Sequence, residues 1–209
     1  MRTVDRVLDM SLVEVLGFVS GALCVWLVVR ENVWNFPIGI ANNLVFIVLF
    51  VGSGLYADAS LQVFYIAIGA YGWWAWLRGG AGGAPLVIRH QPSWAWPVVA
   101  VGVAAGTWVC WELLTRHTDS TVAGWDALTT SLSVAAQLML NRKWVGNWVV
   151  WIVADVLYVV LYAAKGLWLT AALYAGFIAL CVTGLRVWRA KARSSQPDAS
   201  ASSVPSRPV

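Results

Sequence analysis

Residues 142–174 read RKWVGNWVVWIVADVLYVVLYAAKGLWLTAALY, and two long apolar runs in this stretch are separated only by Lys165 and Gly166. Each run approaches the roughly 20 residues that an α-helix needs to cross a bilayer. Similar runs occupy almost all of the remaining chain. The sequence therefore predicts an all-α polytopic membrane protein with seven transmembrane helices. The predicted spans are 12–29, 34–52, 60–77, 94–114, 125–140, 145–163 and 167–185.

The composition agrees with a chain that lies mostly in lipid. Of its 209 residues, 60% are hydrophobic and only 11% are charged, and the mean hydropathy is +0.70. Soluble proteins carry about 25% charged residues. The first apolar run is not expected to be a cleaved signal, because Leu23 stands where a small residue would precede the cleavage site. The three cysteines are isolated within apolar runs, which is typical of buried hydrophobic side chains.

Basic residues gather on one side of the predicted bundle. The side with the N-terminal segment 1–11 has only Arg2, Arg6, Arg116 and Lys165. Cytoplasmic loops are enriched in Lys and Arg, so we expect the N-terminus outside and the C-terminus in the cytoplasm. A Gly-rich flexible linker, 79–93, and a disordered tail, 190–209, would then be cytoplasmic. The basic residues of that side are Arg30, Arg78, Arg89, Arg142, Lys143, Arg186, Arg189, Lys191, Arg193 and Arg207.

The chain resembles itself at an offset of 112 residues. Arg30 aligns with Arg142, Asn35 with Asn147, and the Gly72–Trp76 pair with Gly184 and Trp188. Shared apolar composition does not explain the matching Arg, Asn and Gly. We therefore expect two parallel three-helix repeats, 12–78 and 125–189, joined by a connector helix at 94–114. Transporters built this way have their substrate site between the repeats, near the middle of the membrane.

The sixth predicted span has a polar and aromatic face. Asn147, Trp151 and Asp155 follow one another at steps of four residues, and Trp148 lies beside them. Residues at such spacing share one face of a helix. A carboxylate two turns into a membrane helix is costly in lipid, so Asp155 is expected to face an aqueous cavity or a partner helix.

Other spans have polar residues that could face the same cavity. The second span begins with Trp34 and Asn35 and includes Asn43, and the fifth span contains Gln137. In the repeat register Gly39 stands opposite Trp151, so a flat ligand could stack on the indole above the space at the glycine. The substrate-binding residues predicted on these grounds are Asn43, Asn147, Trp148, Trp151 and Asp155, and Gln137 is expected to face the bundle interior.

These residues favour transport of an organic solute over catalysis. Indole faces attract cations and tolerate large rings, so several indoles beside a carboxylate suit a planar, cationic ligand. The competing class, a membrane-bound quinone or haem enzyme, is disfavoured because His90 and His117 both lie in predicted loops. No grouping for a metal, a catalytic triad or a P-loop is present, so we expect no cofactor, no enzymatic activity and no nucleic-acid partner.

Three stretches together resemble the PnuC family of nicotinamide riboside transporters. They are WNFPIGIANN (34–43), LYADASLQVFYIAIGAYGWWAW (55–76) and the stretch 142–174 quoted above. The resemblance implies a SWEET-like arrangement of three, one and three helices in a bacterial inner membrane, and a homotrimer. It also implies facilitated diffusion of nicotinamide riboside, which phosphorylation traps in the cytoplasm.

The family's W-x-x-W signature falls on Trp148 and Trp151, preceded by Asn147 and followed by Asp155. The resemblance implies that Trp34, Asn35 and Gln137 also bind the substrate. Gly146 replaces the glutamate often found before the Asn, and Asp155 stands where some family members have Asn. Other members of this group carry thiamine or riboflavin. The vitamin identity and proton coupling through Asp155 therefore remain open alternatives.

Overall fold

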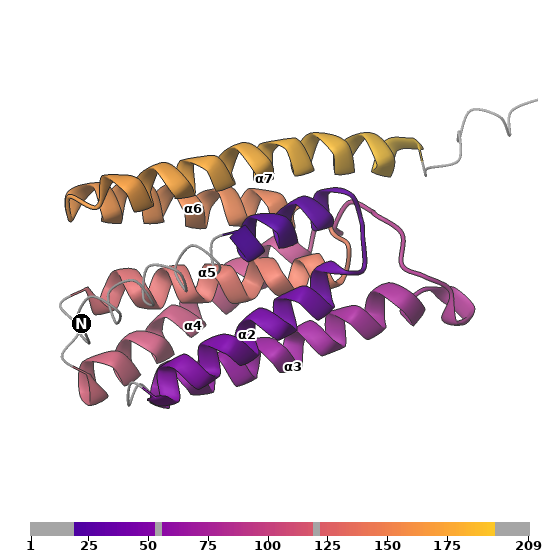
Figure 1. Cartoon of the computed structure of the whole chain (residues 1–209). Coiled ribbons are helices and arrows are strands. Elements are labelled where there is room, and N and C mark those ends of the chain that lie inside the picture. Colours follow the sequence, from indigo (N-terminus) through magenta and orange to yellow (C-terminus); the bar gives the residue numbers. More distant parts are fainter. Residues whose placement is uncertain (1–18, 53–55, 119–121, 195–209) are drawn as a thin grey trace, which may run out of the picture.

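The computed structural model describes residues 19–52, 56–118 and 122–194. These residues form seven α-helices and a short 3₁₀ turn, η1, at Ala81–Gly83. The first described helix is Val19–Val29. The others are α2 Asn35–Gly52, α3 Tyr56–Arg78, α4 Ala95–His117, α5 Ala123–Asn141, α6 Asn147–Ala164 and α7 Trp168–Ser194 (Figure 1). The prediction of an all-helical membrane protein with seven helices is confirmed. The N-terminal segment 1–11 lies outside the described residues.

The last helix differs from its prediction. α7 continues to Ser194, so residues 190–194 are helical rather than part of the tail. The added turn is held by packing and charge, because Ala192 is buried and the Lys191 ammonium pairs with Glu31. The rest of the predicted tail, 195–209, lies outside the described residues.

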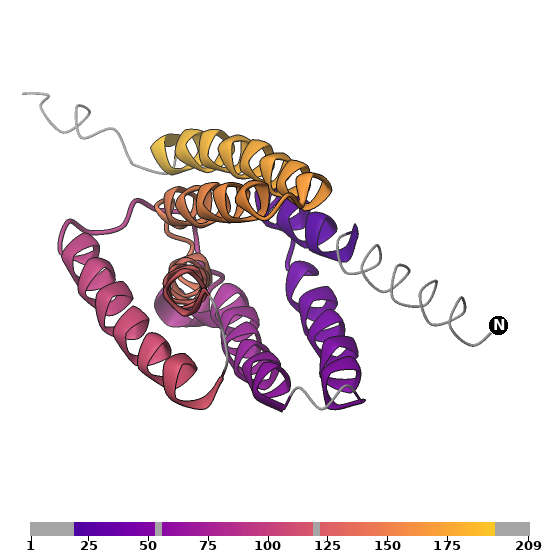
Figure 2. The same ribbon diagram turned by 90° about the vertical axis from the view of Figure 1, so that its left-hand side faces the viewer.

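Four helices, α2, α4, α6 and α7, are long and apolar enough by themselves to cross a bilayer. α5 is less apolar because it lies in the middle of the bundle, where α3, α4 and α6 pack against it (Figure 2). Its buried hydroxyls bond to carbonyls of their own helix: Thr129 donates to Trp125 at 2.9 Å and Ser131 to Ala127 at 2.8 Å. Such pairing removes the cost of burying them.

The helices pack as sequential pairs, α2 with α3, α4 with α5, and α6 with α7 (Figure 1). α4 packs mainly against α5 and exposes large apolar side chains such as Val101, Trp108 and Leu113. An exposed apolar face of this kind is expected to face lipid in a membrane helix.

Two turns at one end of the bundle have the same backbone geometry. Glu31 and Lys143, which are 112 residues apart, both adopt positive φ angles, 56° and 51°. The N–H of Glu31 donates to Val28 and that of Lys143 to Leu140, again pairs at the same offset. The two turns are thus alike in sequence register and in conformation. Over the remainder of the two segments the duplication stays a prediction.

The segment 79–93 was expected to be a flexible linker, and main-chain hydrogen bonds hold it at several points. Leu86 donates to Trp76, and Arg89 exchanges hydrogen bonds with Lys143 and Val145. The N–H of Gly146 donates to the side chain of Gln91 at 2.9 Å. This connection is therefore tied to the turn between α5 and α6.

Candidate substrate-binding cavity

A cavity of about 520 Å³ lies between the first described helix, α2, α3, α5, α6 and α7. This volume is within the range of small-molecule sites, roughly 300–1,000 Å³. Among the described residues, α4 contributes nothing to its lining. The cavity therefore lies between the segments that the sequence pairs as repeats.

One wall, from α6 and α7, is aromatic and acidic. Trp148 is only 1% exposed and packs edge-on against Trp188, with ring centroids 5.4 Å apart. Trp151 lies on the same wall, and Asp155 is one turn further along α6. The Asp155 carboxylate accepts a hydrogen bond from the Cys181 thiol at 3.6 Å, and none of the described salt bridges involves it.

The rest of the lining is rich in carboxamides. It includes Asn35 and Asn43 of α2 and Gln137 of α5, and also Asn42 and Gln62. Carboxamides both donate and accept hydrogen bonds, which suits hydroxyl and amide groups of a ligand.

The orientation of the Gln137 side chain is fixed by a chain of two hydrogen bonds. Its Nε2 donates to Asn141 at 3.1 Å, and Asn141 in turn donates to the carbonyl of Ile68 at 2.8 Å. Asn141 reaches that carbonyl because Gly72 has no side chain; a Cβ there would lie 2.2 Å from the Asn141 oxygen. This chain of contacts joins α3 to α5 and holds one amide at the cavity.

The charge of the lining has one sign. Asp155 is its only carboxylate, and no Lys, Arg or His is among the described lining residues. A buried carboxylate without a cationic partner is costly. A cationic ligand would remove part of that cost, whereas an anionic ligand would add repulsion.

Six of the eight predicted residues lie on the cavity: Asn35, Asn43, Gln137, Trp148, Trp151 and Asp155. Trp34 does not, because it precedes α2 and its side chain is 62% exposed. Asn147 is also outside the lining; it is fully buried, and its Nδ2 donates to the carbonyl of Trp144 at 2.6 Å. Asn35 makes the equivalent bond to Asn32 at 2.8 Å. Both amides thus stabilise the first turn of a helix.

The prediction of site residues omitted several that line the cavity. Tyr158 and Tyr174 pack against each other at a tilt, with ring centroids 4.7 Å apart. Tyr158 continues the helical face of Trp151 and Asp155, so its spacing could have placed it in the site. Tyr174 and Cys181 come from α7, and the sequence has no comparable polar stripe there that would have indicated them.

A second cavity, also about 520 Å³, lies between α3, α4 and α5. Its lining is almost entirely apolar, with Arg142 at its edge. Among the described residues no group of His, Cys, Asp and Glu side chains could hold a metal ion. The first cavity is therefore the better candidate for a polar organic substrate.

The chain is similar to known transporters over most of its length. The family described as "Nicotinamide mononucleotide transporter" matches residues 11–190. The chain is 30% identical to the nicotinamide riboside transporter PnuC of Escherichia coli K12, over 88% of both chains. It is 26% identical to the riboflavin/roseoflavin transporter RibM of Streptomyces davaonensis, over 86% of this chain and 85% of that one.

A solved structure shares the fold. The crystal structure of the vitamin B3 transporter PnuC superposes with a TM-score of 0.68 at 21% identity, covering 89% of this chain and 84% of the other. These matches extend over nearly all the helices that surround the cavity. The chain belongs to the PnuC family of membrane transporters.

Proposed function

We propose that this chain carries nicotinamide riboside across the bacterial inner membrane by facilitated diffusion. One observation supports this substrate best: the cavity is lined by two indoles, one carboxylate and several carboxamides, and by no cationic side chain among the described residues. The pyridinium ring of the riboside is a flat cation, which suits Trp151 and Asp155. Its ribose hydroxyls match the amides of Asn35, Asn43 and Gln137.

The same wall chemistry disfavours the mononucleotide. A phosphate monoester has a charge of about −1.5 to −2 at neutral pH and is usually bound by Arg or Lys. The described lining offers only the negative Asp155. The riboside is therefore the better substrate, although the family description names the mononucleotide.

Two predicted residues act indirectly in this proposal. Asn147 donates to the carbonyl of Trp144 and so ties the start of α6, the helix that presents Trp148 and Trp151, to the turn before it. Trp34 precedes α2 and is suited to the membrane interface, where indoles are enriched.

The membrane context remains part of the proposal. We place the N-terminus outside and the C-terminus in the cytoplasm, where phosphorylation would trap the riboside, and we expect a homotrimer. The turns around Glu31 and Lys143, the 79–93 connection and the end of α7 meet at one end of the bundle. These segments, together with the C-terminal parts of α3 and α7, contain nine of the ten basic residues that the charge distribution assigns to the cytoplasm: Arg30, Arg78, Arg89, Arg142, Lys143, Arg186, Arg189, Lys191 and Arg193.

A second substrate, riboflavin, is favoured by a specific comparison. RibM is named as a riboflavin transporter and matches most of this chain. The cavity volume of about 520 Å³ would also accept a larger ring system. Thiamine, a cation like the riboside, is a further alternative.

Binding to the purified protein distinguishes these substrates. Quenching of its Trp fluorescence should be saturable with nicotinamide riboside. The affinity for the mononucleotide should be lower than that for the riboside by a factor of roughly ten or more, and a factor of ten corresponds to about 1.4 kcal/mol of binding free energy. Saturable quenching by riboflavin or thiamine alone would overturn the assignment.

A further inference from the structure

Three successive layers of residues join the two repeat segments next to the cavity. The first layer belongs to the cavity wall itself and includes Val28 and Phe36 of one repeat segment and Leu140 and Trp148 of the other. These four residues form two pairs at the 112-residue offset, 28 with 140 and 36 with 148. The two segments thus contribute equivalent positions to this end of the cavity.

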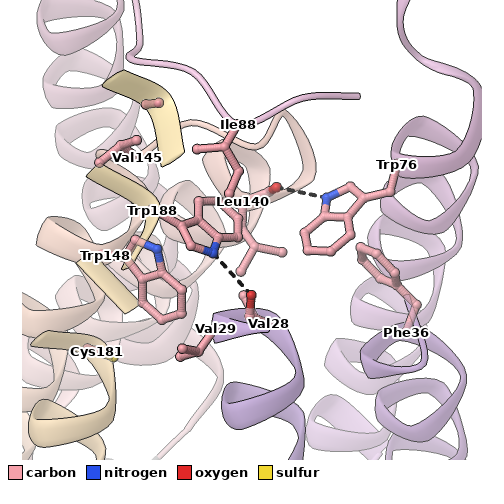
Figure 3. Packing of buried hydrophobic residues seen from close by; sticks show 11 residues of the cluster. Val28, Val29, Phe36, Trp76, Ile88, Leu140, Val145, Trp148, Cys181 and Trp188 are labelled. Carbon is pink, nitrogen blue, oxygen red and sulfur yellow. Dashed lines mark hydrogen bonds between the residues drawn. The ribbon is translucent and has the colours of Figure 1, made fainter. Parts of the chain in front are cut away.

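The second layer is a pair of indoles that joins the two segments (Figure 3). Trp76 donates from Nε1 to the carbonyl of Leu140 at 3.0 Å, and Trp188 donates to the carbonyl of Val28 at 3.2 Å. Trp76 and Trp188 are themselves 112 residues apart, so each segment's indole bonds to the equivalent carbonyl of the other. The two rings are 6.0 Å apart, and their exposed fractions are 3% and 0%.

The third layer is ionic and lies on the indoles. The Lys143 ammonium is 4.5 Å from the centroid of Trp76 and 3.2 Å from a carboxylate oxygen of Glu31. The other carboxylate oxygen of Glu31 accepts from Lys191 at 2.6 Å. Glu31 and Lys143 occupy equivalent positions in the two turns, so this salt bridge also crosses from one repeat segment to the other.

We propose that Glu31, Lys143 and Lys191 form an ionic lock that holds this end of the cavity closed above the Trp76–Trp188 plug. A solute in the cavity could leave past this end only if the two turns separated. Separation would break both indole–carbonyl hydrogen bonds and both ion pairs together. Partly exposed ion pairs are individually weak, so this contact can open repeatedly and still bias the equilibrium toward the closed form.

The inference rests on the proposed transport function, but its test does not depend on the substrate. Cys24 and Cys181 line the cavity, whereas Cys110 lies at the second cavity. In a Cys110→Ser background, a small membrane-impermeant thiol reagent therefore reports entry into the cavity. It is applied separately to each side of oriented vesicles.

Glu31→Gln should raise the labelling rate at least about fivefold when the reagent is applied on the side of the lock, and should not raise it from the other side. The charge distribution predicts that the side of the lock is cytoplasmic. Glu112→Gln is the matched control, because it removes an exposed salt bridge to Arg116 on α4, away from the cavity. Its labelling rate should equal that of the parent. Equal rates for Glu31→Gln and Glu112→Gln would overturn the lock.

A charge exchange separates the lock from general loosening of the fold. In a Lys191→Ala background, Glu31→Lys and Lys143→Glu should each raise the labelling rate. Combining the two substitutions should lower the labelling rate again, toward that of Lys191→Ala alone. The reason is that the two turns are equivalent, so the salt bridge can form with the charges exchanged. A double variant that labels as fast as the single variants would contradict the proposal.

Two further results keep the test decisive. If Glu31→Gln does not purify as a monodisperse protein, Lys191→Gln replaces it, because this variant removes only the more exposed ion pair with Glu31. It should also raise the labelling rate, and an unchanged rate would reject the lock. If labelling responds as expected but nicotinamide riboside does not bind the parent protein, the substrate assignment fails and the lock stands.

Discussion

At the scale of single residues, Trp151 is the side chain on which the substrate site depends most. Its ring lines the cavity, and the equivalent lining position at the 112-residue offset is Gly39, which has no side chain. Trp151→Ala should remove a stacking contact worth on the order of 1–3 kcal/mol. Affinity for nicotinamide riboside would then fall by roughly 5- to 150-fold. Trp151→Phe should retain part of it, and fluorescence or calorimetric titration measures both.

The control for this substitution is an indole elsewhere in the membrane. Trp108 on α4 is 64% exposed and lines neither cavity, so Trp108→Ala should leave affinity unchanged. If the two alanine variants bind the riboside equally well, Trp151 has only a membrane-anchoring role.

Asp155 should act as a counter-charge to the ligand. Its carboxylate is 6% exposed, and the described contact at its oxygen is the Cys181 thiol. Asp155→Asn should therefore weaken binding of the cationic riboside by roughly tenfold, corresponding to about 1.4 kcal/mol. It should change binding of the uncharged, reduced riboside much less. Equal losses for the two ligands would mean that Asp155 supports the helices instead.

The sequence predicted most of this site because helical spacing places residues on a common face. Asn147, Trp148, Trp151 and Asp155 share one side of α6 in the prediction, and three of them line the cavity. Asn147 does not, because a side chain in the first helical turn can instead bond to the backbone before it. The rotation of each helix about its axis and the choice of its neighbours are set by packing. The contribution of Tyr174 and Cys181 from α7 could therefore not be read from spacing.

At the scale of helices, the close approach of α6 and α7 depends on Gly184. A Cβ at this position would lie 2.5 Å from the Trp148 ring, which is buried against Trp188 and cannot easily move. Gly184→Ala should thus force the helices apart and destabilise the protein by about 1–3 kcal/mol. Thermal unfolding of the purified protein, followed with and without riboside, measures this loss.

Gly176 is the matched control on the same helix, since nothing lies within 4 Å of a Cβ placed there. Gly176→Ala should be neutral or stabilise α7 by about 0.5–1 kcal/mol, because alanine has the higher helix propensity. Comparable destabilisation by both substitutions would show that the Trp148 contact is not responsible.

Hydropathy predicts several helix boundaries closely, and the helix end that it misses has a physical reason. The predicted spans 34–52 and 145–163 agree within a few residues with α2 and α6. α7 is longer than predicted because Lys191 finds a carboxylate partner on another segment. A sequence pattern cannot show that partner, since Glu31 is distant along the chain.

At the scale of the whole molecule, the pH dependence of stability should reflect Glu31. Burial by itself would raise the pKa of Glu31, but hydrogen bonding and charge attraction from Lys191 and Lys143 lower it below its ordinary value. A group with a lowered pKa stabilises the fold above its unfolded pKa, about 4.3 for Glu. That stabilisation is lost as the pH falls through the lower, folded value.

The difference in melting temperature between the wild type and Glu31→Gln should therefore stay constant from about pH 5 to 8 and shrink below about pH 4. Thermal unfolding across this range measures it. A difference that already disappears near pH 6 would show that the two lysines do not hold the carboxylate in its charged form.

Transport by the whole molecule should be passive. The described lining contains no His and no carboxylate besides Asp155 with which a proton could be shared. Uptake of nicotinamide riboside should therefore proceed only until its internal and external concentrations are equal. Accumulation driven by an imposed proton gradient would instead make Asp155 a coupling residue.

The most direct measurement is uptake of radiolabelled nicotinamide riboside into proteoliposomes that contain only this protein. Facilitated diffusion of the riboside predicts saturable uptake that stops at equal concentrations, with little inhibition by excess mononucleotide. It also predicts that uptake is lost in Trp151→Ala but retained in Trp108→Ala. Uptake no faster than in protein-free liposomes, with riboflavin or thiamine transported instead, would contradict the proposed function.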